Sequence, residues 1–95
     1  MHKNVWICIE KAEGNYSAYA PAVLGCVSTG KTVEETRLNM AEALGFHFEG
    51  MIEDGESIEA ISEDFPAEVA ARSKGDGEED YFSVVQVRLP ERVNA

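Results

Sequence analysis

Residues 32–53 carry the pattern of one long amphipathic helix. Thr32-Val33-Glu34-Glu35 fits a capping box, in which the Thr32 hydroxyl accepts from the Glu35 amide and the Glu35 carboxylate accepts from the Thr32 amide. Apolar residues then recur at helical spacing in one stripe, which is typical of a helix packed on a sheet. The stripe consists of Val33, Met40, Ala41, Leu44, Phe48, Met51 and Ile52. Asp54-Gly55 supplies a stop, so we expect the helix to end near Glu53.

Three short β-patterns precede this helix and one follows it. Residues 4–11 are apolar on both faces, which predicts a central strand covered from both sides. Residues 16–20 form a hairpin with them, residues 23–27 give a third strand, and residues 81–89 give the last. The order predicts an α+β fold, β-β-β-α-β, with a mostly antiparallel sheet and one long helix packed on it.

The rest of the chain gives weaker signals. Ile58, Ile61 and Phe65 indicate a helical turn at the edge of the core, and a second turn is expected from Pro66. Residues 74–80 are acidic and glycine-containing, which predicts a mobile loop, and residues 90–95 are expected to form a tail. At 95 residues the chain has room for one core, so we expect residues 1–95 to be a single domain.

The net charge of −10 is concentrated in one part of the chain. Residues 42–80 hold 13 acidic and two basic residues, whereas the remainder holds five acidic and six basic ones. Such a surface repels phosphate backbones and attracts basic partners, so we expect no direct binding to nucleic acid. An acidic face that only keeps the protein soluble is the alternative that composition leaves open.

The same composition bears on the cellular compartment. No apolar run is long enough for a signal peptide or a membrane span. Cys8 and Cys26 both lie in apolar stretches, which indicates two buried free thiols rather than a disulfide framework. We therefore expect a cytoplasmic protein that does not contact a membrane.

No residue pattern points to catalysis, a metal or a cofactor. His2 and His47 are far apart, and neither cysteine has zinc-ligand spacing. A metal-dependent nuclease would need acidic residues converging from separate strands, and the strand candidates are only Glu10 and Asp80. We expect no enzyme activity.

Residues between positions 14 and 44 match the sequence motifs of a known family, in the same order and at the same spacing. The stretch 14–21 fits G-x-Y-x-A-x-x-P, the stretch 25–35 fits G-C-x-x-x-G-x-T-x-E-E, and the stretch 39–44 fits N-x-x-E-A-L. The chain resembles the HicB-like antitoxins in this way over about residues 4–89. The residues that carry the resemblance are Gly14, Tyr16, Ala18, Pro21, Gly25, Cys26, Gly30, Thr32, Glu35, Asn39, Glu42 and Leu44. Their residue types are those that turns, bulges and caps require, so we interpret them as scaffold.

The resemblance implies a fold like a cut-down RNase H whose catalytic carboxylates are not retained. It also implies a role, namely binding a small basic HicA-type RNA-cleaving toxin and covering its active site. Many HicB antitoxins continue into a DNA-binding helix-turn-helix or ribbon-helix-helix domain. This chain stops at Ala95, so we expect no DNA binding by it.

Two apolar residues on the helix, Leu38 and Phe46, point away from the stripe and are candidate contacts to a partner or to a second copy. Acidic candidates for the same contact are Glu49, Glu53, Asp54 and Glu56. Two hypotheses remain open. One is the toxin-binding antitoxin; the other is an orphan HicB-like homo-oligomeric scaffold or regulator, with Leu38, Phe46 or the hairpin edge at a symmetric interface.

Overall fold

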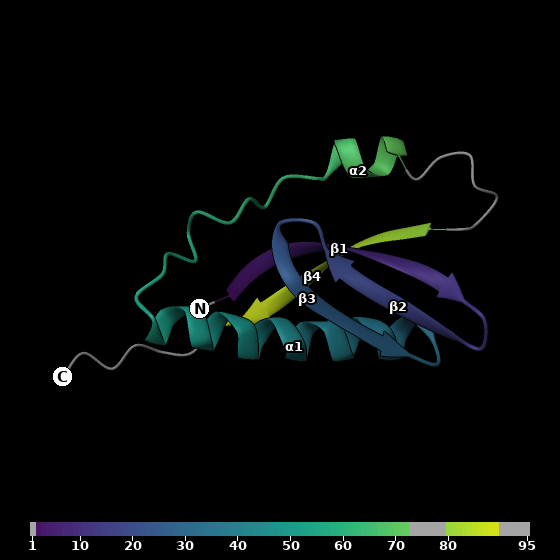
Figure 1. The fold of residues 1–95 in the computed structure, drawn as a ribbon, viewed down its shortest axis with the longest axis horizontal. Helices are drawn as coiled ribbons and strands as arrows, with labels where there is room; N and C mark the ends of the chain where they lie inside the picture. The colour runs from purple at the N-terminus through teal and green to yellow at the C-terminus, as the bar shows by residue number, and fades with distance from the viewer. Residues whose placement is uncertain (1, 73–79, 90–95) are drawn as a thin grey trace.

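The computed structural model describes residues 2–72 and 80–89 and forms one antiparallel sheet with a long helix against it (Figure 1). The elements are β1 (His2–Ala12), β2 (Asn15–Ala20), β3 (Val23–Gly30), α1 (Val33–Glu53), α2 (Ala67–Arg72) and β4 (Asp80–Arg88). The strand order in the sheet is β3-β2-β1-β4. The predicted α+β fold and the central position of the first strand are both confirmed. Nearly all of the predicted loop at 74–80, and all of the tail at 90–95, lie outside the described residues; Asp80 instead begins β4.

The third strand is longer than the sequence predicted, because it continues past Val27 to Gly30. The strand is irregular at Gly25, which has a φ of 83°, in the left-handed region that glycine adopts without strain. The register of β2 against β3 shifts between Tyr19 and Ala20, directly before Pro21. Such a shift is a β-bulge or a similar irregularity, and it lies where a proline, which has no backbone N–H to donate, can follow the strand.

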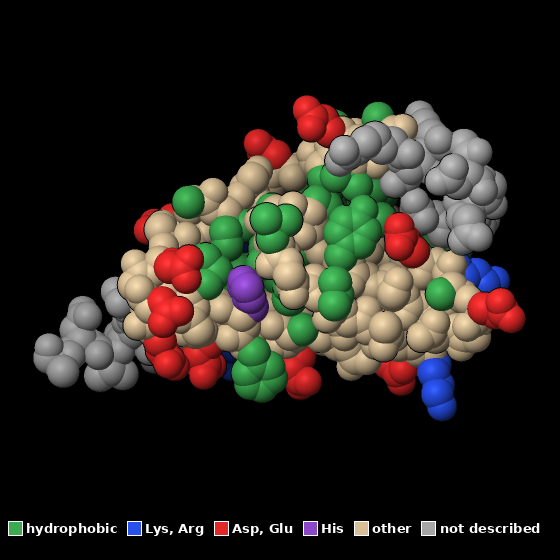
Figure 2. Space-filling view, viewed as in Figure 1, with side chains coloured by type: hydrophobic (Ala, Val, Ile, Leu, Met, Phe, Trp, Pro, Cys, Tyr) green, Lys and Arg blue, Asp and Glu red, His purple; other side chains and the backbone are tan. Residues whose placement is uncertain are grey.

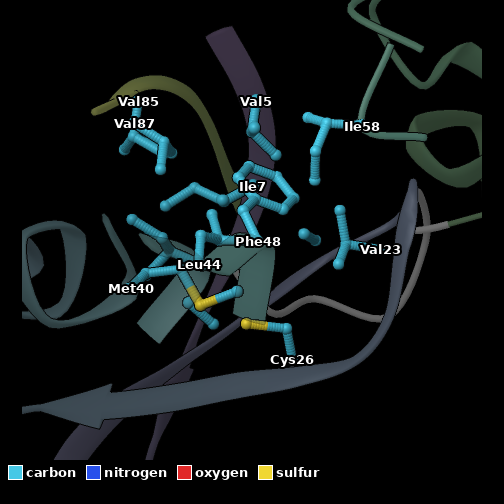
Figure 3. Close-up of a cluster of buried hydrophobic side chains, with 13 residues drawn as sticks. Val5, Ile7, Val23, Cys26, Met40, Leu44, Phe48, Ile58, Val85 and Val87 are labelled. Atoms are coloured by element: carbon cyan, nitrogen blue, oxygen red, sulfur yellow. The ribbon is translucent and has the colours of Figure 1, made fainter. Parts of the chain in front are cut away.

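One apolar core lies between α1 and the sheet (Figure 3). Ile7, Met40, Leu44 and Phe48 are completely buried, and Ile58 closes the core from the segment after the helix. Alternate residues of β1 and β4 supply the sheet side, since Val5 pairs with Val85 in the register. The predicted helical stripe is therefore the buried face of α1.

Local hydrogen bonds define the start of α1. The Thr32 hydroxyl accepts from the Glu35 amide at 3.0 Å, as the capping box predicts. The second bond differs from the prediction, because the Glu35 carboxylate accepts from the Lys31 amide at 2.7 Å and not from Thr32. The Thr36 hydroxyl turns back onto the Thr32 carbonyl at 2.7 Å, which satisfies a polar group that is completely buried.

Gly30 is needed for close packing rather than for a turn, which corrects its sequence interpretation. A Cβ atom at Gly30 would lie 2.6 Å from the Thr36 Oγ1 atom and 2.7 Å from the Thr36 backbone nitrogen. Only a residue without a side chain lets the end of β3 approach the first turn of α1 this closely.

The segment after α1 passes to the opposite face of the sheet, where α2 lies (Figure 1). Lys3, which is nearly buried, forms an ion pair with Glu63 of this segment at 3.4 Å. Phe65 then packs edge-on against Trp6 and Phe82, with ring centroids 5.0 and 5.5 Å apart. The predicted turn around residue 58 is present, but Phe65 lies on the second face of the sheet instead of at the edge of the core.

Candidate protein-binding surface

The solvent-exposed side of α1 combines carboxylates with two large apolar side chains. We define the outer face of α1 by six exposed residues, Glu35, Leu38, Glu42, Phe46, Glu49 and Glu53. At 100° per residue these six positions fall within an arc of about 80° around the helix, opposite the buried stripe. Leu38 is 63% and Phe46 68% exposed, and about 12 Å of helix axis separates them. The outer face contains four carboxylates and neither lysine nor arginine.

The structure brings together four of the six candidate contact residues on this face. Leu38, Phe46, Glu49 and Glu53 lie on it, and Asp54 and Glu56 follow directly beyond its end, both exposed. Figure 2 shows acidic side chains gathered at the left of the molecule, where α1 ends in Figure 1. The surface is therefore a continuous apolar and acidic strip that extends past the last turn of the helix.

The end of this strip is electrostatically unfavourable for the free protein. The carboxyl end of a helix carries a partial negative charge that basic residues normally offset. The last turn of α1 contains no basic residue, and Glu53 and Asp54 lie at that end. Each such carboxylate costs about 0.3–1 kcal/mol when exposed, and a cationic group on a partner would remove that cost.

Arg37 and Asn39, which point to opposite sides of α1, were not recognised from the sequence as residues that connect the helix to the sheet. The Arg37 Nε atom donates to the Ser83 hydroxyl at 2.8 Å and the Nη2 atom to the Val84 carbonyl at 3.3 Å, both on β4. The Asn39 amide donates to the Thr29 carbonyl on β3 at 2.9 Å. The two outer strands are in this way both bound to α1. Only the family motif singled out Asn39; no local pattern marks Arg37.

The family-motif residues occupy positions that fit a scaffold. Ala18, Cys26 and Leu44 are buried in the core, and Tyr16 packs against it. Gly14 has a φ of 85° in the β1–β2 turn. Glu35 and Glu42 differ from these, because both are exposed on the outer face of α1. Burial raises the pKa of the Cys26 thiol above its ordinary value, which keeps it protonated and unreactive.

Two acidic positions that the sequence offered for a nuclease lie side by side in the sheet. Glu10 and Asp80 are direct partners in the β1–β4 register. Nowhere in residues 2–72 and 80–89 do three or more histidine, cysteine, aspartate or glutamate side chains gather as metal ligands would. Within the same residues, neither helix is long and apolar enough to cross a membrane.

Comparison with known proteins gives the family. The profile described as "HicB_like antitoxin of bacterial toxin-antitoxin system" matches residues 5–90, and the chain belongs to this family. An uncharacterised 14.9 kDa protein from the rep-hol intergenic region of Haemophilus phage HP1 is 50% identical over 52 residues. That match covers 55% of this chain but only 39% of the phage protein, so the chain spans less than half of that relative.

Solved structures share the fold over nearly the whole chain. The N-terminal domain of the Burkholderia pseudomallei antitoxin HicB has a TM-score of 0.72 and 26% identity, covering 92% of this chain and 100% of that domain. A chain of the HicA3 and HicB3 toxin-antitoxin complex has a TM-score of 0.65 and 23% identity, covering 94% of this chain and 100% of that one. The predicted HicB-like fold is confirmed by both.

Proposed function

We propose that this chain acts as an antitoxin that binds and neutralises a small basic HicA-type toxin through the outer face of α1. Residues 1–95 would form one domain for this purpose, without a cofactor, without catalysis and without direct contact to nucleic acid or membrane. The site of action would be the cytoplasm. Membership of the antitoxin family and the fold shared with a chain of a toxin-antitoxin complex support this role.

The composition of the outer face of α1 is the observation that carries the proposal. Leu38 and Phe46 provide apolar anchors of the kind that dominate protein interfaces once buried. The four carboxylates around them attract a basic surface and speed its approach, an effect that salt screens. A face made only to keep the protein soluble would have no reason to expose a phenylalanine and a leucine among the acids.

The charge also explains how binding would inhibit an RNA-cleaving partner. A protein that cleaves RNA must hold phosphates, so its active surface carries arginine and lysine. The carboxylates of α1 present negative charge with a spacing set by a rigid helix. They would pair with the groups that otherwise hold RNA and thereby exclude the substrate.

The decisive experiment is a calorimetric titration of the chain with the HicA-type protein encoded in the same genome. Changing Leu38→Ala and Phe46→Ala together is expected to weaken binding at least about tenfold, because the apolar anchors are lost while helix propensity is kept. Changing Glu42→Gln, Glu49→Gln and Glu53→Gln together is expected to reduce the salt dependence of the affinity. The same variants should fail to restore growth of cells that express the toxin.

A matched control is the pair Leu24→Ala and Val27→Ala, which removes exposed apolar residues from β3 instead of α1. This pair should bind the toxin as the unchanged chain does. If the Leu38 and Phe46 variant binds with full affinity, the outer face of α1 is not the toxin site. If the unchanged chain binds no HicA-type protein and is recovered alone as a defined oligomer, the orphan scaffold is the better account.

A further inference from the structure

The face of the sheet away from α1 is apolar and only partly covered. Phe65 packs against Trp6 and Phe82, which places both on this second face. Cys8 pairs with Phe82 and with Tyr19 in the register, so these three side chains project on the same side. Figure 2 shows hydrophobic side chains gathered between α2 and the strands. A surface of this kind needs a cover to keep it from water.

The cover is formed by residues 62–71, which we call the strap and which include most of α2. The Ala67 amide donates to the Phe65 carbonyl at 2.8 Å and the Ala70 amide to the Pro66 carbonyl at 3.0 Å, so both bonds stay within the strap. A helix of six residues such as α2 is not stable by itself in water. Its helical structure therefore depends on contact with the rest of the protein.

Glu63 and Phe65 attach the strap to the sheet through their side chains. The Glu63 carboxylate lies 3.4 Å from the Lys3 ammonium, and the Glu63 side chain is 50% exposed. The Phe65 ring contacts Trp6 and Phe82 but stays 48% exposed. The core residues of α1 are by contrast completely buried. Little contact area is therefore lost when the strap leaves, so its departure costs much less free energy than unfolding of the core.

Charge opposes closure of the strap, and Lys3 offsets this repulsion. Residues 62–71 contain Glu63, Asp64 and Glu68 but neither lysine nor arginine, on a protein with a net charge of −10. Like charges repel, which favours movement of the strap away from the rest of the molecule. The Lys3 side chain is only 8% exposed, and a charge so far removed from water needs a partner. Without Glu63, a state that admits water to this ammonium becomes more favourable.

We infer that the strap opens and closes as a unit while the core stays folded, and that Phe65 and the Lys3–Glu63 ion pair hold it closed. In the open state Trp6 and Phe82 face water, and α2 loses its helical structure. The core between α1 and the sheet is kept, because the residues that form it lie outside the strap. The inference is independent of the proposed function, since neither state requires a toxin.

Hydrogen exchange of the unchanged chain, measured residue by residue, tests the opening. The Ala70 amide reports on the strap, because its hydrogen bond lies within it, and the amides of β1 report on unfolding of the core. We expect the protection of the Ala70 amide to be about 100-fold or more below that of β1 and to depend only weakly on urea, because local opening exposes little surface. Equal protection and equal urea dependence would mean that the strap leaves only when the whole protein unfolds, and would overturn the inference.

A core variant separates opening of the strap from unfolding. Val85→Ala truncates a side chain that is 4% exposed in the core, on the face of β4 opposite the strap. It should lower the protection of the β1 amides about tenfold or more, because it destabilises the core. The Ala70 amide should stay within about twofold, because opening of the strap leaves the core intact. A parallel fall at Ala70 and in β1 would show a single cooperative unit and reject the strap.

Two further variants test what holds the strap closed. Phe65→Ala should lower the protection of the Ala70 amide about fivefold or more, whereas its control Phe46→Ala, which removes an exposed ring from α1, should not change it. Glu63→Gln should lower this protection about threefold or more. Its control Asp64→Asn removes the same charge from the next residue, which is exposed, and should not lower it. If either variant protects Ala70 as well as its control does, that side chain does not hold the strap and the inference is wrong about it.

Discussion

The side-chain amide of Asn39 donates a hydrogen bond of 2.9 Å to the backbone carbonyl of Thr29 and so joins α1 to the outer strand β3. Arg37, two residues earlier on the helix, makes the equivalent connection to β4 through Ser83 and Val84. Residues two apart on a helix point to opposite sides, which allows one turn of α1 to hold both outer strands. The position of the helix across the sheet is in this way fixed by side chains as well as by the core.

Changing Asn39→Asp removes the amide donor while it keeps the shape and helix propensity of the side chain. We expect the free energy of unfolding to fall by about 1–2 kcal/mol, because a carboxylate oxygen would face the Thr29 carbonyl. Urea denaturation measures the change. The control is Gln86→Glu, which adds the same negative charge at an exposed position of β4. Equal stability of the two variants would mean that the Asn39 bond contributes nothing.

Two glycine substitutions should have opposite effects. At Gly30 an added methyl group would meet the Thr36 side chain and backbone, so Gly30→Ala is expected to destabilise the protein by about 1–3 kcal/mol. At Gly45, inside α1, nothing lies within 4 Å of an added Cβ, and Gly45→Ala should stabilise it by about 1 kcal/mol through helix propensity. Thermal unfolding of both variants tests the close approach of β3 and α1. A Gly30→Ala protein as stable as the unchanged one would refute it.

Local patterns in the sequence predicted the elements well, because their causes are local. The cap at Thr32, the helical spacing of Met40, Leu44 and Phe48, and the alternation along β1 each involve residues close in the chain. The family motif added the expectation of a fold like a cut-down RNase H. The exposure of Leu38 and Phe46 followed from the same helical spacing.

Contacts between distant residues were not predictable in the same way. Thr36 looks like an ordinary polar helix residue, and only the approach of Gly30 makes it a buried one. The 46-residue separation of Arg37 and Ser83 leaves no periodic trace in the sequence. Phe65 was assigned to the core edge because nothing near it shows that the chain changes faces of the sheet before reaching Trp6.

The acidic end of α1 gives a prediction for stability. Changing Glu53→Lys replaces a carboxylate at the negative end of the helix by a cation and should raise the melting temperature by about 2–5 °C. The control Glu42→Lys makes the same change in net charge near the middle of the helix, where the dipole has little effect. A larger rise in melting temperature for Glu42→Lys than for Glu53→Lys would show that the stabilisation comes from the lower overall charge and not from the helix end.

The Cys26 thiol predicts a loss of stability at high pH. Because burial raises its pKa in the folded protein, the thiol stays protonated there while the unfolded thiol, with an ordinary pKa of 9.0, ionises. This contribution is complete below pH 9.0 and is lost as the pH rises through the folded pKa. Chemical denaturation between pH 8 and pH 10 should show a steeper decline for the unchanged protein than for Cys26→Ala. Parallel curves would mean that Cys26 does not contribute.

The guanidinium of Arg37 against β4 has a consequence for growth of the sheet. A sheet edge with unpaired backbone groups can accept further strands and polymerise into a fibre, since every added strand offers a fresh edge. The Arg37 side chain places a cation and a hydrogen-bond donor on β4, one of the two outer strands. Replacing Arg37 by an uncharged residue would remove that protection and is the change expected to open the way to filaments.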